Sequence, residues 1–141
     1  MIKAVVFDVG GVLCEWQSIC RKLAAEAGTE YKKFLEVFMQ ISLNPKTGSD
    51  LGRMSTDEFF VKLSSVFGLP EKAADWRRRL VLGFRRIKPT YRLLDELKGK
   101  YKLAVVTNAK PGLWDEWKGG GIKRIFYDYR RFQRSPMFKT G

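Results

Sequence analysis

A carboxylate and two glycines follow a short apolar run near the start of the chain. Residues 2–7 are mostly β-branched or aromatic, which is typical of a strand buried on both faces, and they lead into Asp8, then Gly10 and Gly11. Open parallel sheets bind ligands beyond the carboxyl ends of their strands, so Asp8 stands where a nucleophile could act. The glycines carry no Cβ and would let backbone N–H groups approach an anion. Alternatively, Asp8 only caps a turn that the glycines make.

A second polar pair follows another apolar run. Residues 102–106 are predicted to form a buried strand, and Thr107 and Asn108 come directly after it. A strand, a helical crossover and another strand favour a parallel pair, which would place Asp8 and Thr107 in one crevice. Alternatively, the Thr107 hydroxyl bonds to its own turn, and Asn108 is an ordinary turn residue.

Helical periodicity dominates the chain between these two runs. Apolar residues recur at helical spacing over residues 16–27, 29–41, 55–67 and 70–87, and a shorter helix is predicted over 89–98. Four helices with no strand among them would bury their apolar stripes against one another and form a small cap.

Local signals mark several ends of these helices. We expect Gly28 in the left-handed conformation, Thr29 as the cap of the second helix, and a capping box between Ser55 and Glu58.

The order of elements predicts an α/β protein with a partial Rossmann-like parallel sheet and an inserted helical cap. Residues 1–13 and 89–141 would form a discontinuous core, and residues 14–88 the cap. Near the end, we expect a helix over 113–118 and a strand over 125–129.

The composition limits the classes of function. The chain has 141 residues, of which 45% are hydrophobic, and this suits one globular domain with a small insertion. No apolar run approaches the roughly 20 residues that cross a bilayer, and no signal peptide precedes the first strand, so we expect a cytoplasmic protein without membrane contact. Cys14 and Cys20 are expected to be buried thiols on one helix.

The net charge is strongly positive. Lys and Arg total 27 against 15 acidic residues, a net charge of +12, which favours a small phosphorylated or otherwise anionic substrate. Basic runs at 77–79, 85–86 and 130–131 are predicted to be solvated faces, and no nucleic-acid-binding motif accompanies them, so a nucleic acid partner is not expected.

Three segments resemble motifs of a known family. Residues 5–13 (VVFDVGGVL) resemble the first motif of the haloacid dehalogenase-like hydrolase superfamily, and residues 102–109 (KLAVVTNA) resemble its second motif. Residues 50–60 (DLGRMSTDEFF) resemble the cap pattern of the subfamily with a helical cap. The order and spacing of all three make the resemblance fairly specific.

The resemblance implies a function, most plainly a small-molecule phosphatase that uses Mg²⁺. Asp8 would attack phosphorus and also ligate Mg²⁺. Thr107, Asn108 and the backbone at Val9 would bind the phosphoryl oxygens, and the Gly10 backbone would border them and give its carbonyl to the metal.

Two elements of the family lie further along or are missing. Lys139 is a weakly specified match to a basic residue that stabilises the nucleophile. The acidic pair that completes the Mg²⁺ site is not found in the chain. The family core also needs strands beyond the first one, so we expect an amino-terminal fragment, or a second chain or dimer that covers the exposed sheet edge.

Gly10 departs from the phosphatase pattern. The family usually has Asp two positions after the nucleophile, where it protonates the leaving group, and glycine cannot do this. General acid catalysis is worth about a hundredfold to ten-thousandfold in rate. The dehalogenase branch lacks this Asp and needs no metal, so a 2-haloacid dehalogenase is the alternative enzyme. A catalytically inactive protein that binds an anion or a partner is the non-enzymatic alternative.

Overall fold

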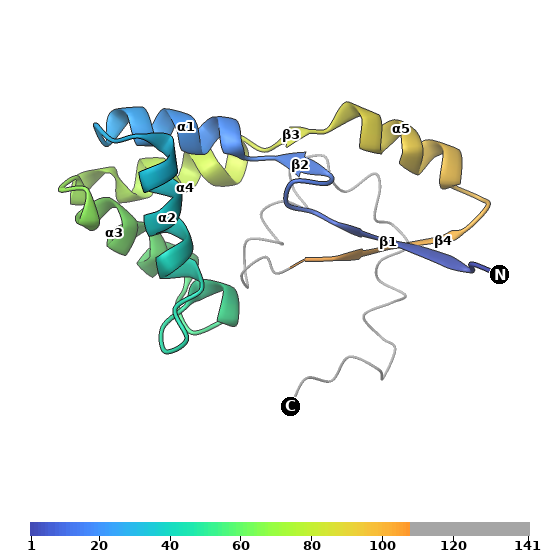
Figure 1. The fold of residues 1–141 in the computed structure, drawn as a ribbon, viewed down its shortest axis with the longest axis horizontal. Helices are drawn as coiled ribbons and strands as arrows, with labels where there is room; N and C mark the ends of the chain where they lie inside the picture. Colours follow the sequence, from blue (N-terminus) through green and yellow to red (C-terminus); the bar gives the residue numbers. More distant parts are fainter. Residues whose placement is uncertain (108–141) are drawn as a thin grey trace.

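The computed structural model describes residues 1–107. Figure 1 shows helices α1 to α4 gathered at one end, β1, β4 and α5 at the other, and β2 and β3 between them. The elements in chain order are β1 (Ala4–Asp8), β2 (Cys14–Glu15), α1 (Gln17–Glu26), α2 (Tyr31–Ser42), η1 (Ser49–Leu51), α3 (Thr56–Val66), η2 (Pro70–Lys72), α4 (Ala73–Leu82), β3 (Arg85–Arg86), α5 (Lys88–Leu97) and β4 (Lys102–Val106). The elements predicted over 113–118 and 125–129 lie outside the described residues.

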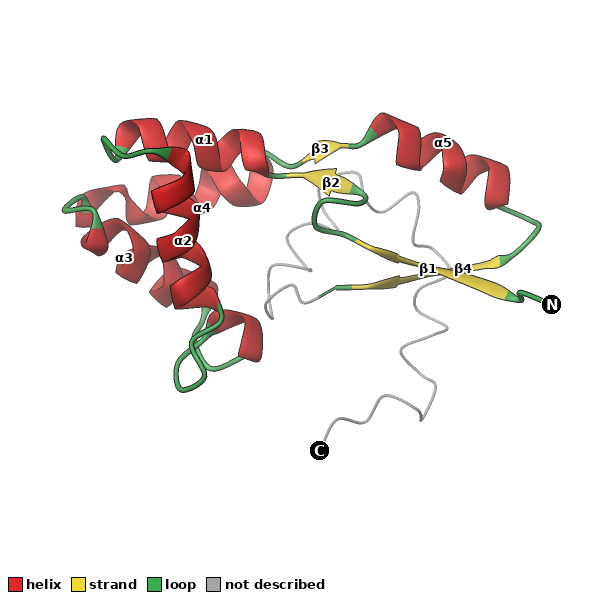
Figure 2. Cartoon of the chain, in the orientation of Figure 1, coloured by secondary structure: helices red, strands yellow, loops and turns green. Residues whose placement is uncertain are grey.

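The two longer strands pair in parallel, as the sequence predicts. Ala4 lies opposite Lys102 at one end of the β1–β4 ladder, and Asp8 lies opposite Val106 at the other. Helix α5 runs along one side of this pair (Figure 2). Its Leu94 packs in one apolar cluster with Phe7 of β1 and other residues of the sheet. The predicted α/β fold class is therefore confirmed.

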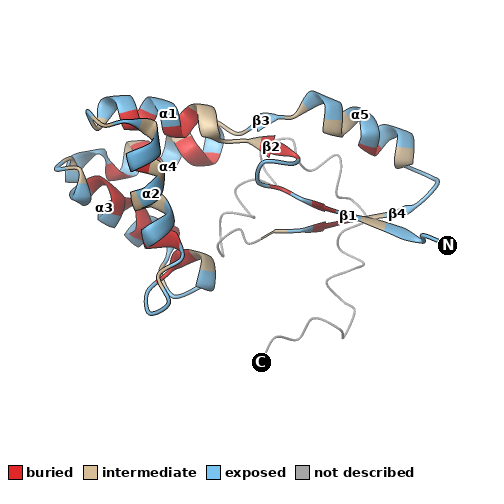
Figure 3. Cartoon of the chain, viewed as in Figure 1, coloured by how far each residue is buried: buried red, intermediate tan, exposed pale blue. Residues whose placement is uncertain are grey.

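The prediction that the first strand is buried on both faces is wrong. Phe7 and Val105 are each 7% exposed, whereas Val6 is 55% and Val106 61% exposed. Successive strand residues point to opposite faces, and α5 packs against the face that carries Phe7 and Val105. Figure 3 shows buried and exposed residues side by side along these strands. Within residues 1–107, β1 pairs only with β4, and cover of its other edge by a second chain stays a prediction.

A second apolar cluster holds α1 to α4 together. Phe34, Phe59 and Trp76 are completely buried in it. The Phe34 ring lies 5.2 Å from that of Phe67 and 5.7 Å from that of Trp76, centroid to centroid. Burial of each such side chain stabilises the fold by about 1.5–3 kcal/mol, so these aromatic residues supply much of the cap's stability.

Local signals at the helix ends gave mixed results. The Ser55–Glu58 capping box is present, and Gly28 has a φ of 63° as expected. The prediction for Thr29 is wrong, because Glu30 is the N-cap of α2 and makes no side-chain cap bond. The Thr29 N–H instead donates to the Ala24 carbonyl and closes the end of α1.

The helix predicted over residues 70–87 ends early and a short strand occupies its last part, whereas no strand lies between α1 and α4, as expected. Helix α4 stops at Leu82, and β3 then pairs with β2 in antiparallel fashion. A Cβ on Gly83, the C-cap of α4, would lie 2.7 Å from Ile19 Cδ1 of α1, so only glycine fits where the helix ends. Strands of two residues are too short to leave a periodic pattern in the sequence.

This short ribbon also changes where the cysteines lie. Cys14 is in β2 and Cys20 in α1, so they are not on one helix as predicted, although both are buried free thiols. Cys14 and Val81 pack in the cluster beneath the sheet with Phe7 and Leu94. The domain boundaries at 13/14 and 88/89 stay a prediction. The apolar cluster beneath the sheet contains residues from both sides of each boundary.

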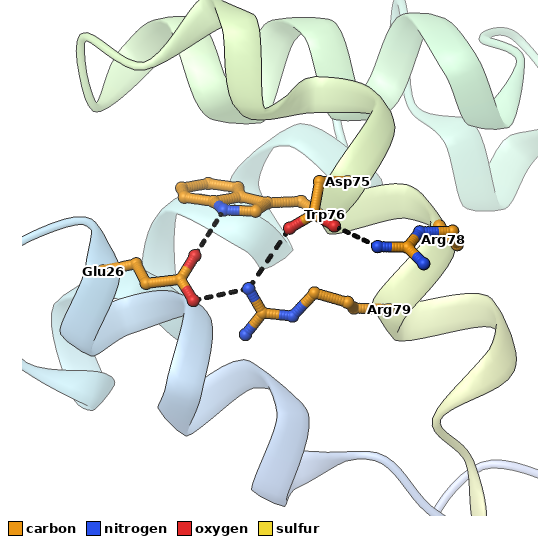
Figure 4. Close-up of polar contacts among 5 residues, drawn as sticks. All are labelled: Glu26, Asp75, Trp76, Arg78 and Arg79. Carbon is orange, nitrogen blue, oxygen red and sulfur yellow. Dashed lines mark hydrogen bonds and ion pairs between the residues drawn. The ribbon is translucent and has the colours of Figure 1, made fainter.

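A polar cluster ties α1 to α4 (Figure 4). The Glu26 carboxylate accepts hydrogen bonds from Trp76 Nε1 at 3.2 Å and from Arg79 Nη1 at 2.5 Å. Arg79 also lies 3.3 Å from Asp75, which accepts from Arg78 at 2.7 Å. Glu26 thus satisfies the indole N–H of a completely buried side chain.

Replacing Glu26 with alanine should destabilise the cap. The Trp76 N–H would lose its acceptor, which costs about 1–3 kcal/mol when the donor is buried. Urea unfolding followed by circular dichroism measures the change. Glu36→Ala, at an exposed position of α2, is the control and should stay within about 0.5 kcal/mol of the parent. Equal losses in both variants would contradict this account of Glu26.

Candidate active site

Asp8 and Thr107 come to the same edge of the sheet. Asp8 is the last residue of β1, its side chain is exposed, and its ladder partner Val106 immediately precedes Thr107. Adjacent strands lie about 4.8 Å apart, so the two residues are neighbours at the carboxyl ends of parallel strands. The structure therefore brings together two predicted site residues from separate parts of the chain, Asp8 at the end of β1 and Thr107 directly after β4. Asn108 and Lys139 lie outside the described residues.

The loop after β1 holds the Asp8 carboxylate in place. The Val9 N–H donates to Asp8 Oδ1 at 2.6 Å. The Val9 carbonyl accepts from the backbone of Leu13 at 3.0 Å and of Cys14 at 2.9 Å, and the Gly11 N–H donates to the Cys14 carbonyl at 2.8 Å. Val9, predicted as an anion donor, thus contacts the nucleophile itself in this structure, and a substrate oxygen would have to share or displace that bond.

The two glycines of this loop differ. Gly11 has a φ of 80°, which L side chains rarely adopt, whereas Gly10 is not among the residues with positive φ. A Cβ placed on Gly10 would lie 3.8 Å from Trp16 Nε1, and one on Gly11 would lie 3.9 Å from Gln17 Nε2. Gly10 therefore has room for a side chain, and Gly11 is needed for the turn.

Sequence reasoning missed that Trp16 and Gln17 border this loop. It placed Trp16 in the apolar stripe of a cap helix, a position that reveals nothing about its indole N–H. The two side chains reach the loop because β2 is short and α1 begins directly after it, at Gln17. No signal in the sequence locates that contact, because it depends on the path of the chain between residues 9 and 16.

Glu15 fixes the start of α1. Its Oε1 accepts from the Ser18 N–H at 2.5 Å and its Oε2 from the Ser18 hydroxyl at 2.7 Å. These bonds to Ser18 lower the pKa of Glu15, and Arg85, its partner in the β2–β3 pair, adds to the effect. Glu15 is therefore a negative charge at the N-terminal end of α1, next to Trp16 and Gln17.

The cysteines are poor candidates for a nucleophile. Burial raises the pKa of the Cys14 thiol, and burial raises the pKa of Cys20 to about 12. A thiol reacts as its thiolate, so both are inert near neutral pH. Among the residues discussed, Asp8 alone combines a nucleophilic group with exposure at the edge of the sheet.

Asp8 and Gly10 are the residues of the described part of the chain that would hold a magnesium ion, as the sequence predicts. The Asp8 carboxylate and the Gly10 carbonyl are hard oxygen donors from one loop, and Mg²⁺ is often held by one or two carboxylates with substrate phosphate and water. Within residues 1–107, no group of three or more His, Cys, Asp or Glu side chains is arranged to hold a metal ion. None of the helices in that range has the length and apolar character that a bilayer crossing requires.

Comparison with known proteins gives structural relatives only. No protein-family model matches the chain, and no curated protein does. Among solved structures, the L-2-haloacid dehalogenase from Xanthobacter autotrophicus superposes with a TM-score of 0.65 at 23% identity, over 93% of this chain and 59% of its own. The same enzyme with chloropropionic acid covalently bound gives a TM-score of 0.64 at 21% identity, with the same coverage of both chains.

A further dehalogenase structure superposes with a TM-score of 0.66 at 19% identity, over 88% of this chain and 59% of its own. The chain therefore has the haloacid dehalogenase-like fold that its motifs predict. It spans about 59% of the length of these dehalogenases.

Alanine at the two glycines should have opposite consequences. Gly11→Ala forces a Cβ into the left-handed region, which costs about 1–2 kcal/mol. Gly10→Ala meets only ordinary contacts and should be neutral or slightly stabilising, because it restricts the unfolded chain. Urea midpoints of the two variants, measured side by side, test this. The explanation fails if Gly10→Ala is as damaging as Gly11→Ala.

Proposed function

We propose that Asp8 is the nucleophile of a hydrolase that acts on small anionic substrates. The observation that carries this proposal is an exposed carboxylate at the carboxyl end of β1, beside Thr107, with one oxygen held by the Val9 N–H. A carboxylate held in one orientation has already lost the freedom that attack would otherwise cost. The shared fold with haloacid dehalogenases, one of them with a chloropropionic acid adduct, supports the same role.

The chemistry follows from this geometry. Since Val9 holds Oδ1, we assign the attack to Oδ2 of Asp8. Oδ2 forms a bond to the substrate carbon or phosphorus while the bond to the leaving atom breaks, and that atom departs with the electron pair. In a dehalogenase, water then attacks the carboxyl carbon of the Asp8 ester and the bond from that carbon to Oδ2 breaks; in a phosphatase, water attacks phosphorus and the bond from phosphorus to Oδ2 breaks. Both steps release the product and restore the carboxylate.

Gly10 favours a halide as the leaving group. A halide departs as a stable anion and needs no proton, whereas an alkoxide from a phosphate ester needs a general acid. Gly10 has no side chain to supply that proton. Together with the dehalogenase relatives, this makes a short 2-haloacid the first candidate substrate.

A Mg²⁺-dependent phosphatase is the second candidate. The oxygen donors of Asp8 and Gly10 favour it, because these two groups would hold the metal, which would neutralise charge on a bound phosphate. The net charge of +12 attracts a phosphate dianion as well as a carboxylate.

Asp8→Asn should abolish hydrolysis. One assay follows chloride release from both enantiomers of 2-chloropropionate with EDTA present, and another follows phosphate release from an aryl phosphate with Mg²⁺. Loss of either activity in Asp8→Asn, with full activity in Asp95→Asn on the exposed side of α5, is the expected result. With 2-chloropropionate, a single turnover in H₂¹⁸O should place the label in Asp8 and not in the first product. Label in the first product from this haloacid, or no turnover of either substrate by the parent, would overturn the proposal.

Gly10→Asp adds a general acid and so tests whether the leaving group is one that needs a proton. A Cβ fits at this position, 3.8 Å from Trp16 Nε1, and Gly10 does not have a positive φ, so a side chain can start here without backbone strain. For a phosphatase, hydrolysis of an alkyl phosphate should rise by about a hundredfold to ten-thousandfold. For a dehalogenase, chloride release should not rise. Gly10→Asn, of equal size but without an acidic proton, is the control, and an equal gain from it would contradict acid catalysis.

A further inference from the structure

The indole nitrogen of Trp16 lies next to the position that a side chain on Gly10 would occupy. Its Nε1 lies 3.8 Å from where a Gly10 Cβ would be. The ring is half-buried, and it stacks on Phe38 with centroids 5.6 Å apart and planes at 28°. Trp16 is also the N-cap residue of α1, so both its backbone and its ring are held. The indole N–H is therefore a neutral donor held beside Gly10, which lies two residues after the nucleophile.

We propose that Trp16 Nε1–H donates a hydrogen bond to the departing atom of the substrate. This inference rests on the proposed function of Asp8. In the proposed mechanism, the resemblance implies that the position two residues after the nucleophile borders the leaving group, and the Trp16 indole nitrogen lies 3.8 Å from where a Gly10 side chain would begin. An indole N–H stabilises negative charge without giving up its proton. The site is therefore specific for leaving groups that depart as anions, such as a halide or an aryl oxide.

Neighbouring residues hold this donor in position. The Trp16 backbone N–H donates to Gln17 Oε1 at 3.4 Å, and Glu15 bonds to Ser18 in the next turn. The Gln17 amide nitrogen, at the start of α1, lies beside Gly11 and is a second neutral donor next to this loop. Donors fixed before the reaction stabilise developing charge without reorganising, and removal of one costs about a hundredfold to a thousandfold in kcat.

Trp16→Phe tests the donor directly, because phenylalanine keeps an aromatic ring against Phe38 but has no N–H. With a series of substrates whose leaving groups differ in basicity, kcat should fall by about a hundredfold, and more for the more basic leaving groups, while KM changes little. Trp76→Phe is the matched control, since it removes an indole N–H that Glu26 accepts, and it should change stability but not the dependence on leaving group. A loss in Trp16→Phe that is the same for every leaving group, or no loss, would overturn the inference.

Anion binding separates this inference from the role of Asp8. The full-length Asp8→Asn chain, labelled with ¹⁵N, is titrated with bromide and, separately, with inorganic phosphate. A saturable downfield shift of the Trp16 indole resonance, identified by its loss in Trp16→Phe, supports the donor, and the responding anion identifies the kind of leaving group. If the parent chain proves inactive, the proposed function fails and this titration alone decides the role of Trp16. An indole resonance that moves with neither anion would then overturn it.

Discussion

The parallel pairing of β1 with β4 is the constraint on which the site depends. Its register places Asp8 opposite Val106 and so brings Thr107 to the same edge. A shift of one residue would turn Asp8 toward the face that α5 covers and expose Phe7 instead. The packing of Phe7 with Leu94 of α5 therefore fixes the register, and the register presents the carboxylate.

The loop after β1 connects that sheet to the cap within a few residues. Gly11 supplies the positive φ that turns the chain, and the bonds to the Val9 carbonyl close the loop. The consequence is that α1 begins beside this loop, with Trp16 next to Gly10 and Gln17 next to Gly11. Both side chains are neutral although the chain carries a net charge of +12, which is why we propose them as donors that form no ion pair with the Asp8 carboxylate.

The cap keeps α1 in this place through two kinds of contact. Glu26 at the far end of α1 bonds to Trp76 and Arg79 of α4, and the apolar cluster packs the sides of the helices. The β2–β3 ribbon has only two residues in each strand and would be marginal alone. Phe84 packs against both apolar clusters and so joins the cap to the sheet as well.

The sequence by itself determined the features whose signals are local or follow the order of elements. Asp8 at a strand end, the left-handed Gly28, the Ser55–Glu58 capping box and the parallel pair all came from short-range chemistry or from the strand–helix–strand order. It also indicated the haloacid dehalogenase-like fold, which the structural relatives share.

Only the tertiary structure decided which surfaces meet. It showed that Val6 is exposed while Phe7 is buried, that α4 gives way to a strand after Leu82, and that Trp16 borders Gly10. Periodicity reveals which side of an element is apolar, but it does not specify the partner that covers that side. Contacts between residues distant along the chain, or around a tight turn, depend on the folded path, and such a contact placed the Trp16 indole nitrogen beside Gly10.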